Sequence, residues 1–211
     1  KAPLLEHHSV DRREEFVKNL AIRPESEGDR EAITRFWDDD GEGFFFTASD
    51  HEDLIVRKKT SQDGAIPSGN SVAAIALLRL GKLLEDDFFS EKGFRTIRAY
   101  GQLLEKVPAA FPMLLIALDF HLDKPLEIAI AGDLLSLDSK TSLRAVNRVF
   151  LPNKVLAFQS GMDGTDSNNL VPFLDGKVRL ESAATVYICE NFVCREPLTD
   201  ADAVEERLRN L

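Results

Sequence analysis

The chain has 211 residues, of which 44% are apolar and 29% are charged, so it holds enough apolar material for the core of one large domain or two small ones. Acidic residues outnumber basic residues by 36 to 26 and give a formal net charge of −10, which repels phosphate backbones and argues against a nucleic-acid partner. No apolar run approaches the roughly 20 residues that span a bilayer, and the amino end shows no secretory leader, so a membrane is not expected as a partner either. The sequence starts at Lys1 rather than Met, which leaves a processed or longer precursor open.

Helical spacing of apolar residues dominates the first 124 residues. It predicts helices over 9–20, 29–37, 71–84, 90–106 and 112–121. The helix 71–84 is apolar almost all round and must therefore be covered on most of its sides. Between the second and third helices, two short runs of high strand propensity, 43–47 and 54–57, predict a β-hairpin, which an irregular loop over 60–70 follows.

The pattern changes at Pro125. From there the sequence predicts strands and helices in alternation, with an exposed polar loop over 161–169. The strands are expected over 126–133, 155–158 and 184–189, and the helices over 142–150 and 200–211. Such an alternation favours a small, mainly parallel α/β unit. The expected domains are therefore a helical part over 1–124 and an α/β unit over 125–211.

The strongest candidate site is a polar path that runs from the expected hairpin into the helix 71–84. Asp63 is the residue for which we predict a catalytic role, as a general acid or base. A ligand is predicted to contact the polar residues around it: Asp53, Arg57, Lys58, Ser68, Asn70 and Ser71. The basic pair suits an anion or sugar hydroxyls, and the first N–H groups of the helix face the same loop. The alternative is structural, with Asn70 capping the helix and Asp63 paired with Lys58.

Trp37 is a further candidate for ligand binding, because its ring and the aromatic run 44–46 suit a stacking platform for a sugar. Aromatic residues beside a hairpin are, however, more often part of the core. The acidic turn 49–53 lacks the glycine and the distant bidentate acid of a calcium loop, so no metal is expected. The turn after the strand 126–133 lacks a complete Gly-x-Gly-x-x-Gly motif, and no cofactor is expected.

Two cysteines, Cys189 and Cys194, are too few for a disulfide framework, which favours a reducing, cytoplasmic location. Two sulfurs do not complete a zinc site. Five residues apart in a strand and turn, the two side chains are within reach of each other. Buried, reduced thiols are nevertheless the expected state, since free cysteine is usually packed away.

Three stretches of the chain together resemble one known family. They are 36–47, which begins Phe-Trp-Asp and ends Gly-Phe-Phe-Phe-Thr, 53–71, which ends Asp-Gly-Ala-Ile-Pro-Ser-Gly-Asn-Ser, and 189–194, which reads Cys-Glu-Asn-Phe-Val-Cys. On these residues, the chain from Asp29 to its end resembles the carboxy-terminal portion of the YyaL-like, spermatogenesis-associated thioredoxin-domain family. The resemblance implies a thioredoxin-like domain, then a six-hairpin (α/α) toroid similar to that of sugar epimerases and glycosidases, then a small α/β end.

The chain departs from that plan, because it has no Cys-x-x-Cys motif, no room for the thioredoxin-like domain and about half of a toroid's helices. The expected fold class is therefore mixed α and α/β: helical hairpins of a partial (α/α) toroid with a β-hairpin insert, followed by the α/β unit. The first functional hypothesis is carbohydrate binding or processing through a polar cup, with a sugar-like small molecule as ligand. The alternative is a non-catalytic interaction or scaffold module. Either way, the apolar helical face needs a cover, from a second copy in a homo-oligomer or from missing N-terminal domains.

Overall fold

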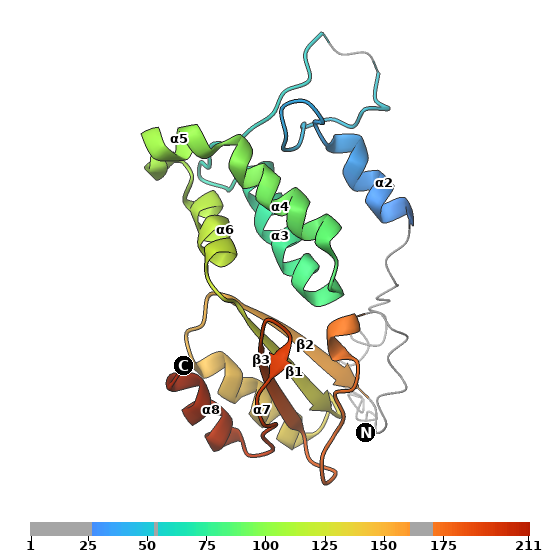
Figure 1. The fold of residues 1–211 in the computed structure, drawn as a ribbon, viewed down its shortest axis with the longest axis vertical. Helices are drawn as coiled ribbons and strands as arrows, with labels where there is room; N and C mark the ends of the chain where they lie inside the picture. Colours follow the sequence, from blue (N-terminus) through green and yellow to red (C-terminus); the bar gives the residue numbers. More distant parts are fainter. Residues whose placement is uncertain (1–26, 53–54, 161–170) are drawn as a thin grey trace, which may run out of the picture.

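A computed structural model describes residues 27–52, 55–160 and 171–211 of the protein. The predicted helix 9–20, the candidate residue Asp53 and the predicted loop 161–169 lie outside the described residues. A layer of helices occupies one half of the molecule, and a sheet with two further helices occupies the other (Figure 1). Within the described ranges, no helix is long and apolar enough to cross a membrane. The cytoplasmic location stays a prediction.

The helical layer contains five α-helices and one short 3-10 helix among the described residues. They are α2 (Glu27–Phe36), α3 (Gly69–Leu84), α4 (Asp87–Ala99), α5 (Gly101–Lys106), η1 (Pro108–Ala110) and α6 (Pro112–Leu122). The helix predicted over 90–106 is wrong as a single element, because the chain leaves helical geometry at Tyr100, immediately before Gly101. The low helix propensity of Gly101 weakens a continuous helix at this point, and α5 follows as a separate short helix.

Helices α3 and α4 form a closely packed hairpin. Asp86 caps α4 by accepting the N–H of Phe88, and only two residues separate the helices. The close approach depends on Gly93, where an added Cβ would lie 2.9 Å from the Leu78 side chain and 3.0 Å from the carbonyl oxygen of Ala74. Helix α6 completes the layer around a core of apolar side chains. This core includes Ala74, Leu78, Ile97, Leu114, Ala117 and Phe120.

The β-hairpin predicted from 43–47 and 54–57 is wrong for the residues that the structure describes. Phe44 forms only an isolated bridge with Trp37, and the N–H of Phe46 donates to the carbonyl oxygen of Lys58 over 2.8 Å. The buried amide of Asn70 takes the place of a partner strand. Its Oδ1 accepts the N–H of Phe44, and its Nδ2 donates to the carbonyl oxygens of Phe44 and Thr60. The segment therefore bonds to a side chain of α3 instead of forming the strand that its local propensity predicts.

The α/β unit contains four strands in the order β2-β1-β3-β4. Its elements are β1 (Leu126–Gly132), α7 (Leu137–Arg148), β2 (Lys154–Ser160), η2 (Pro172–Leu174), β3 (Thr185–Glu190), β4 (Val193–Cys194) and α8 (Ala201–Arg209). Strands β1 and β2 are parallel, whereas β3 is antiparallel to both β1 and β4. The prediction of a mainly parallel unit is therefore wrong. A helical crossover joins β1 to β2, but β3 enters the sheet from the opposite end and continues into β4 through a tight turn.

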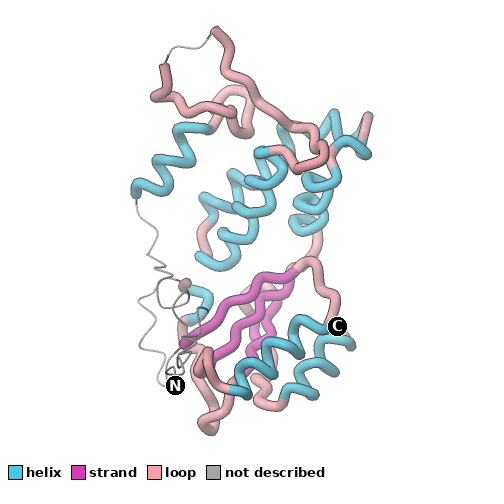
Figure 2. The backbone as a smooth tube through the Cα atoms, turned by 180° about the vertical axis from the view of Figure 1, so that it is seen from behind, coloured by secondary structure: helices cyan, strands magenta, loops and turns pink. Residues whose placement is uncertain are grey.

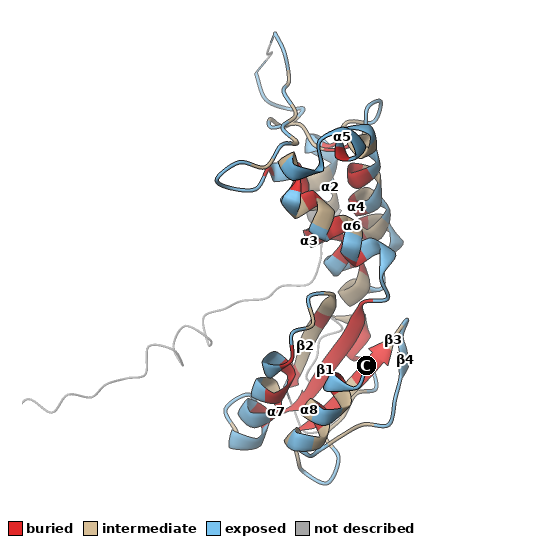
Figure 3. Ribbon diagram, turned by 90° about the vertical axis from the view of Figure 1, so that its left-hand side faces the viewer, coloured by how far each residue is buried: buried red, intermediate tan, exposed pale blue. Residues whose placement is uncertain are grey.

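The sheet lies between two layers of helix, as the tube view from behind makes clear (Figure 2). On one face, Ile128 and Ile130 of β1 pack against α7 and α8. The other face points to the helical layer, where Leu83 of α3 packs beside Ala129 and Phe173. All seven residues of β1 are buried, and this central strand forms the red band across the lower half of Figure 3. The two halves therefore share a continuous packed interior.

Candidate functional site

Asp63 lies where the loop before α3 meets the start of α6. Its Oδ1 accepts the N–H of Ser68, and its Oδ2 accepts the N–H of Met113, each over 2.8 Å. Its own N–H donates to the carbonyl oxygen of Ala110 over 2.9 Å. Asp63 therefore joins two segments of the helical layer that are 50 residues apart in the sequence.

The carboxylate of Asp63 caps α6 although it lies 50 residues away in the sequence. Phe111, the residue at the cap position of α6, makes no side-chain cap bond, and Asp63 satisfies an N–H of the first turn in its place. Burial acts to raise the pKa of Asp63, but donors from Ser68, Ser71, Met113 and Leu114 outweigh it and lower the pKa below its ordinary value.

A carboxyl group with a lowered pKa is ionised at neutral pH and has no proton to donate as a general acid. Both oxygens of Asp63 already accept backbone N–H groups, so action as a base requires one of these bonds to break. The arrangement is the one expected of a structural cap. The catalytic role of Asp63 stays a prediction.

Ser68 and Ser71 lie beside Asp63, as the sequence predicts, and both are buried. The Ser68 hydroxyl caps α3 by accepting the N–H of Ser71, and the two hydroxyl oxygens lie 2.9 Å apart. The structural alternative that gave the cap to Asn70 is therefore wrong, since Asn70 holds the 44–60 segment instead. These polar groups are occupied by partners within the chain.

Arg57 and Lys58 do not join this cluster. The guanidinium of Arg57 donates to the carbonyl oxygens of Arg35 and Thr47 and lies 4.0 Å from the centre of the Phe45 ring. The side chain of Lys58 is exposed. The predicted pairing of Asp63 with Lys58 is replaced by backbone donors.

Trp37 belongs to the core, with only 4% of its surface exposed. Its ring packs edge-on against Phe44, with 5.0 Å between ring centres, and Lys92 Nζ lies 3.8 Å from the centre of the indole. The ring is thus covered by other side chains and offers no open stacking platform.

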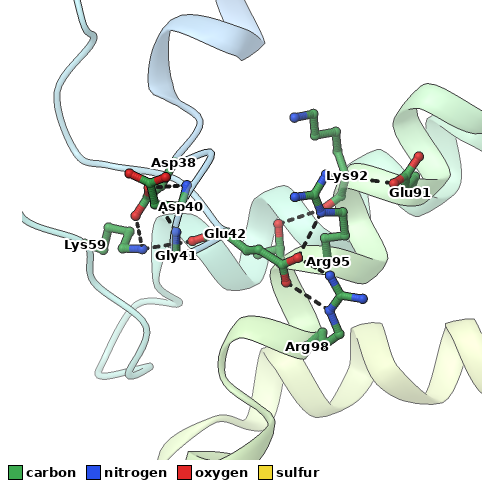
Figure 4. Close-up of polar contacts among 10 residues, drawn as sticks. Asp38, Asp40, Gly41, Glu42, Lys59, Glu91, Lys92, Arg95 and Arg98 are labelled. Atoms are coloured by element: carbon green, nitrogen blue, oxygen red, sulfur yellow. Dashed lines mark hydrogen bonds and ion pairs between the residues drawn. The ribbon is translucent and has the colours of Figure 1, made fainter.

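A network of ion pairs beside Trp37 is the main polar feature that the sequence analysis missed. Glu42 points between Arg95 and Arg98 of α4, while Asp38 pairs with Lys59 (Figure 4). The Arg98 guanidinium lowers the pKa of Glu42 against the effect of burial, and Arg95 adds to the lowering. The available sequence signal was the run Asp-Asp-Asp-Gly over 38–41, whose consecutive acids and glycine favour a turn but do not indicate its basic partners. The network fixes that turn on α4.

An apolar groove of about 560 Å³ lies between α2 and α3. Its wall includes Ile33, Phe36, Phe46, Ala73, Ala76 and Leu80. Phe46 is 77% exposed and Leu80 is 39% exposed, so large apolar side chains face the open side of the groove. The sequence predicts part of this surface, because the helix 71–84 is apolar almost all round.

Glu127 is a fully buried acidic residue within the apolar strand β1. Its carboxylate pairs with Lys82 Nζ of α3 at 3.1 Å and accepts the N–H of Phe192 over 2.7 Å. A glutamate inside an otherwise apolar run was the available signal, since a buried charge needs partners. Glu127 joins the sheet to the helical layer.

Cys189 and Cys194 form a disulfide, so the expectation of reduced thiols is wrong. They lie directly opposite each other on β3 and β4, with 3.9 Å between their Cα atoms. The two-residue turn places them at a position where the strands do not exchange hydrogen bonds and the side chains come closest. Among the described residues, no group of three or more His, Cys, Asp or Glu side chains is placed to hold a metal ion.

The fold is a helical layer packed on a small α/β unit with a mixed sheet, and an open apolar groove lies on the helical side. No protein-family model matches the chain. Over 166 residues, or 78% of its length, the chain is 38% identical to spermatogenesis-associated protein 20 of Rattus norvegicus and 37% identical to the protein of that name in Homo sapiens. It is also 34% identical over 175 residues to an uncharacterized protein of Caenorhabditis elegans.

The chain is therefore a homologue of spermatogenesis-associated protein 20, and these matches support its assignment to that family. The matched region is 21% of the length of the rat and human proteins and 23% of the nematode protein. The chain thus spans about a fifth of the length of the curated relatives that it matches.

Proposed function

We propose that the chain is a non-catalytic packing module, and that the groove between α2 and α3 receives an apolar helix from the longer polypeptide typical of this family. The open groove is the single observation that carries the proposal. It exposes Phe46 and Leu80 together, and a contiguous exposed apolar surface is typical of an interaction site.

The composition of α3 suits a helix as the occupant. Gly69, Ala73, Ala76 and Leu80 recur along the groove wall at intervals of three and four residues, which places them on one face of the helix. Small residues on that face allow another helix to approach closely, and the aromatic side chains of the opposite wall then close over it. The same packing serves the proposed arrangement of the helical hairpins as part of an (α/α) toroid.

The length of the relatives favours a source within the same polypeptide. The match covers only 21% of the rat protein, so most of that protein lies outside the matched region and is available to supply the helix. Folding within one polypeptide also avoids the loss of translational freedom that an intermolecular contact carries.

Carbohydrate binding or processing, the other hypothesis, has less support. The oxygens of Asp63, the Asn70 amide and the Trp37 ring are all engaged within the chain. A sugar site needs free polar groups beside an open ring face, and the groove is instead lined mainly by apolar side chains. The polar cup therefore stays a prediction without an observation that favours it.

A photo-crosslinking experiment in the full-length rat relative tests the packing proposal. A match of 166 residues within a chain of 211 necessarily includes central residues such as Ala76 and Arg144. The crosslinking amino acid is placed at the position aligned with Ala76, on the groove, and at the position aligned with Arg144, which is exposed on α7, as a control. The expected result is an intramolecular crosslink from the first position to a peptide outside the matched region.

Two results would overturn the proposal. A crosslinked product of doubled mass on a denaturing gel means that a second copy fills the groove. A yield from the Ala76 position no greater than that from the Arg144 position means that the groove is open in the full protein. The carbohydrate hypothesis is tested separately by thermal-shift screening of this chain against sugars and sugar phosphates, and it fails if none raises the Tm.

A further inference from the structure

The hairpin of β3 and β4 is closed by the disulfide and by a strained turn. Asn191 and Phe192 form its two central residues, with φ angles of 49° and 63°. A two-residue hairpin turn requires these positive angles, but residues with a side chain other than Asn or Asp adopt them reluctantly. The covalent link across Cys189 and Cys194 holds the strand ends together and so favours this turn.

The turn is also a contact between the two halves of the molecule. Phe192 donates its N–H to the Glu127 carboxylate, and Lys82 Nζ lies 5.1 Å from the centre of the Phe192 ring. Glu127 stands directly opposite Cys189 in the pairing of β1 with β3, so both side chains lie on the face that meets α3. The hairpin turn, the central strand and the last turn of α3 therefore converge on one buried carboxylate.

The two ends of the disulfide differ in access. Cys194 is an exposed residue, whereas Cys189 is fully buried. An incoming thiolate therefore reaches the Cys194 sulfur more readily, and thiol exchange proceeds at the sulfur that can be approached.

We propose that Cys189–Cys194 is a thiol–disulfide exchange site at which a dithiol reductant attacks Cys194, and that its reduction loosens the packing of the sheet against α3. The attacking thiolate forms a bond to Cys194 Sγ, and the electron pair of the broken S–S bond goes to Cys189 Sγ, which takes up a proton. The second thiol of the reductant then displaces Cys194 as a thiol. The chain gains two electrons and two protons, and the dithiol becomes a disulfide.

Reduction acts on the helical layer through Phe192. Without the covalent closure, the turn relaxes from its positive φ angles, and the Phe192 N–H withdraws from Glu127. The buried carboxylate then keeps the Lys82 contact but loses a backbone donor. Because Lys82 belongs to α3, the last turn of that helix becomes less firmly held against the sheet.

The first measurement identifies the reacting sulfur. The whole chain is incubated briefly under native conditions with glutathione and quenched with acid, so that the first mixed disulfide is trapped before a second thiol displaces it, and the product is mapped by peptide mass spectrometry. The expected adduct is on Cys194, with Cys189 released as a free thiol. An adduct mainly on Cys189, or no adduct on the folded chain under conditions where the urea-unfolded chain reacts, overturns the proposal.

The second measurement follows the coupling to α3 by hydrogen exchange with and without dithiothreitol. Exchange is expected to quicken in the 189–194 hairpin and in the α3 peptide that contains Lys82, and to stay unchanged in α7 on the other face of the sheet. The Tm is expected to fall by about 4–9 °C, from the chain-entropy effect of so short a closed loop.

Cys194→Ser is the matched variant, because it removes the bond at the exposed position and leaves the buried Cys189 in place. It should match the reduced wild-type chain in exchange and in Tm, and dithiothreitol should change neither quantity further. A reduced chain in which the hairpin exchanges faster while the Lys82 peptide does not would overturn the coupling. A response of Cys194→Ser to dithiothreitol would overturn the assignment of the effect to this disulfide.

Discussion

Replacement of Asp63 by Asn tests whether this carboxylate is a cap that joins α3 to α6. Asn retains the shape of the side chain but has one acceptor oxygen, so either Ser68 or Met113 directs its N–H at an NH₂ group. A hydrogen bond to a charged group contributes about 1.5–3 kcal/mol, and the lower part of this range applies because Asp63 is only half-buried. We expect a loss of about 2 kcal/mol in unfolding free energy, which corresponds to a fall of about 4–8 °C in Tm.

The pH dependence gives this prediction a second, independent readout. The pKa of Asp63 is lowered in the folded chain, so its ionised form stabilises the fold fully above its ordinary pKa of 3.8, and this contribution disappears as the pH falls through the lower folded value. The Tm of wild type should therefore exceed that of Asp63→Asn by its full margin at about pH 7, and this margin should shrink below about pH 4. Asp39→Asn, at an exposed position in the turn that follows α2, is the control and should leave the Tm nearly unchanged. If Asp63→Asn also leaves the Tm unchanged, or if its effect is constant down to about pH 2, the cap interpretation is refuted.

Two further substitutions test the packing of the helical layer. Gly93→Ala should lower the unfolding free energy by about 1–3 kcal/mol, because the new methyl group meets the backbone and a side chain of α3. Gly101→Ala is the control and should be neutral or stabilising, because the space around its Cβ is open. Urea unfolding of both variants measures the difference in unfolding free energy. Asn70→Asp should lower the unfolding free energy by about 2–4 kcal/mol, because the second carboxylate oxygen would face the two carbonyl oxygens to which the amide now donates. A Tm equal to that of wild type would contradict the role assigned to Asn70.

Helix positions follow from the sequence where one apolar period is unbroken. The prediction over 71–84 and the observed α3 differ by two residues at one end, and 112–121 differs from α6 by one residue. The break at Tyr100 was missed because α4 and α5 continue the same apolar stripe. The direction of β3 was also missed, because strand periodicity carries no information about the end from which a strand enters a sheet.

The partners of the candidate-site side chains could likewise be predicted from the sequence only in part. The grouping of Asp63 with Ser68 and Ser71 follows from their nearness in the sequence, and the structure brings all three together. The partner that defines the role of Asp63 is the Met113 N–H, 50 residues away, and no local pattern indicates it. The partners of Glu127 are likewise remote, since the Phe192 N–H lies 65 residues further along the chain. Long-range backbone donors thus decide what these carboxylates do.

Asp63 and Glu127 stabilise the fold in the same way but differ in their burial. Each carboxylate accepts the N–H of a distant segment and thereby fixes a loop, at the start of α6 in one case and at the β3–β4 turn in the other. Asp63 is half-buried, so water can replace part of a lost bond, whereas the fully buried Glu127 depends on Lys82 and Phe192. The contact between sheet and helices is therefore the more sensitive of the two to the loss of a single donor. Since these acidic groups are committed to holding the fold, the proposed packing role depends on the open groove between α2 and α3.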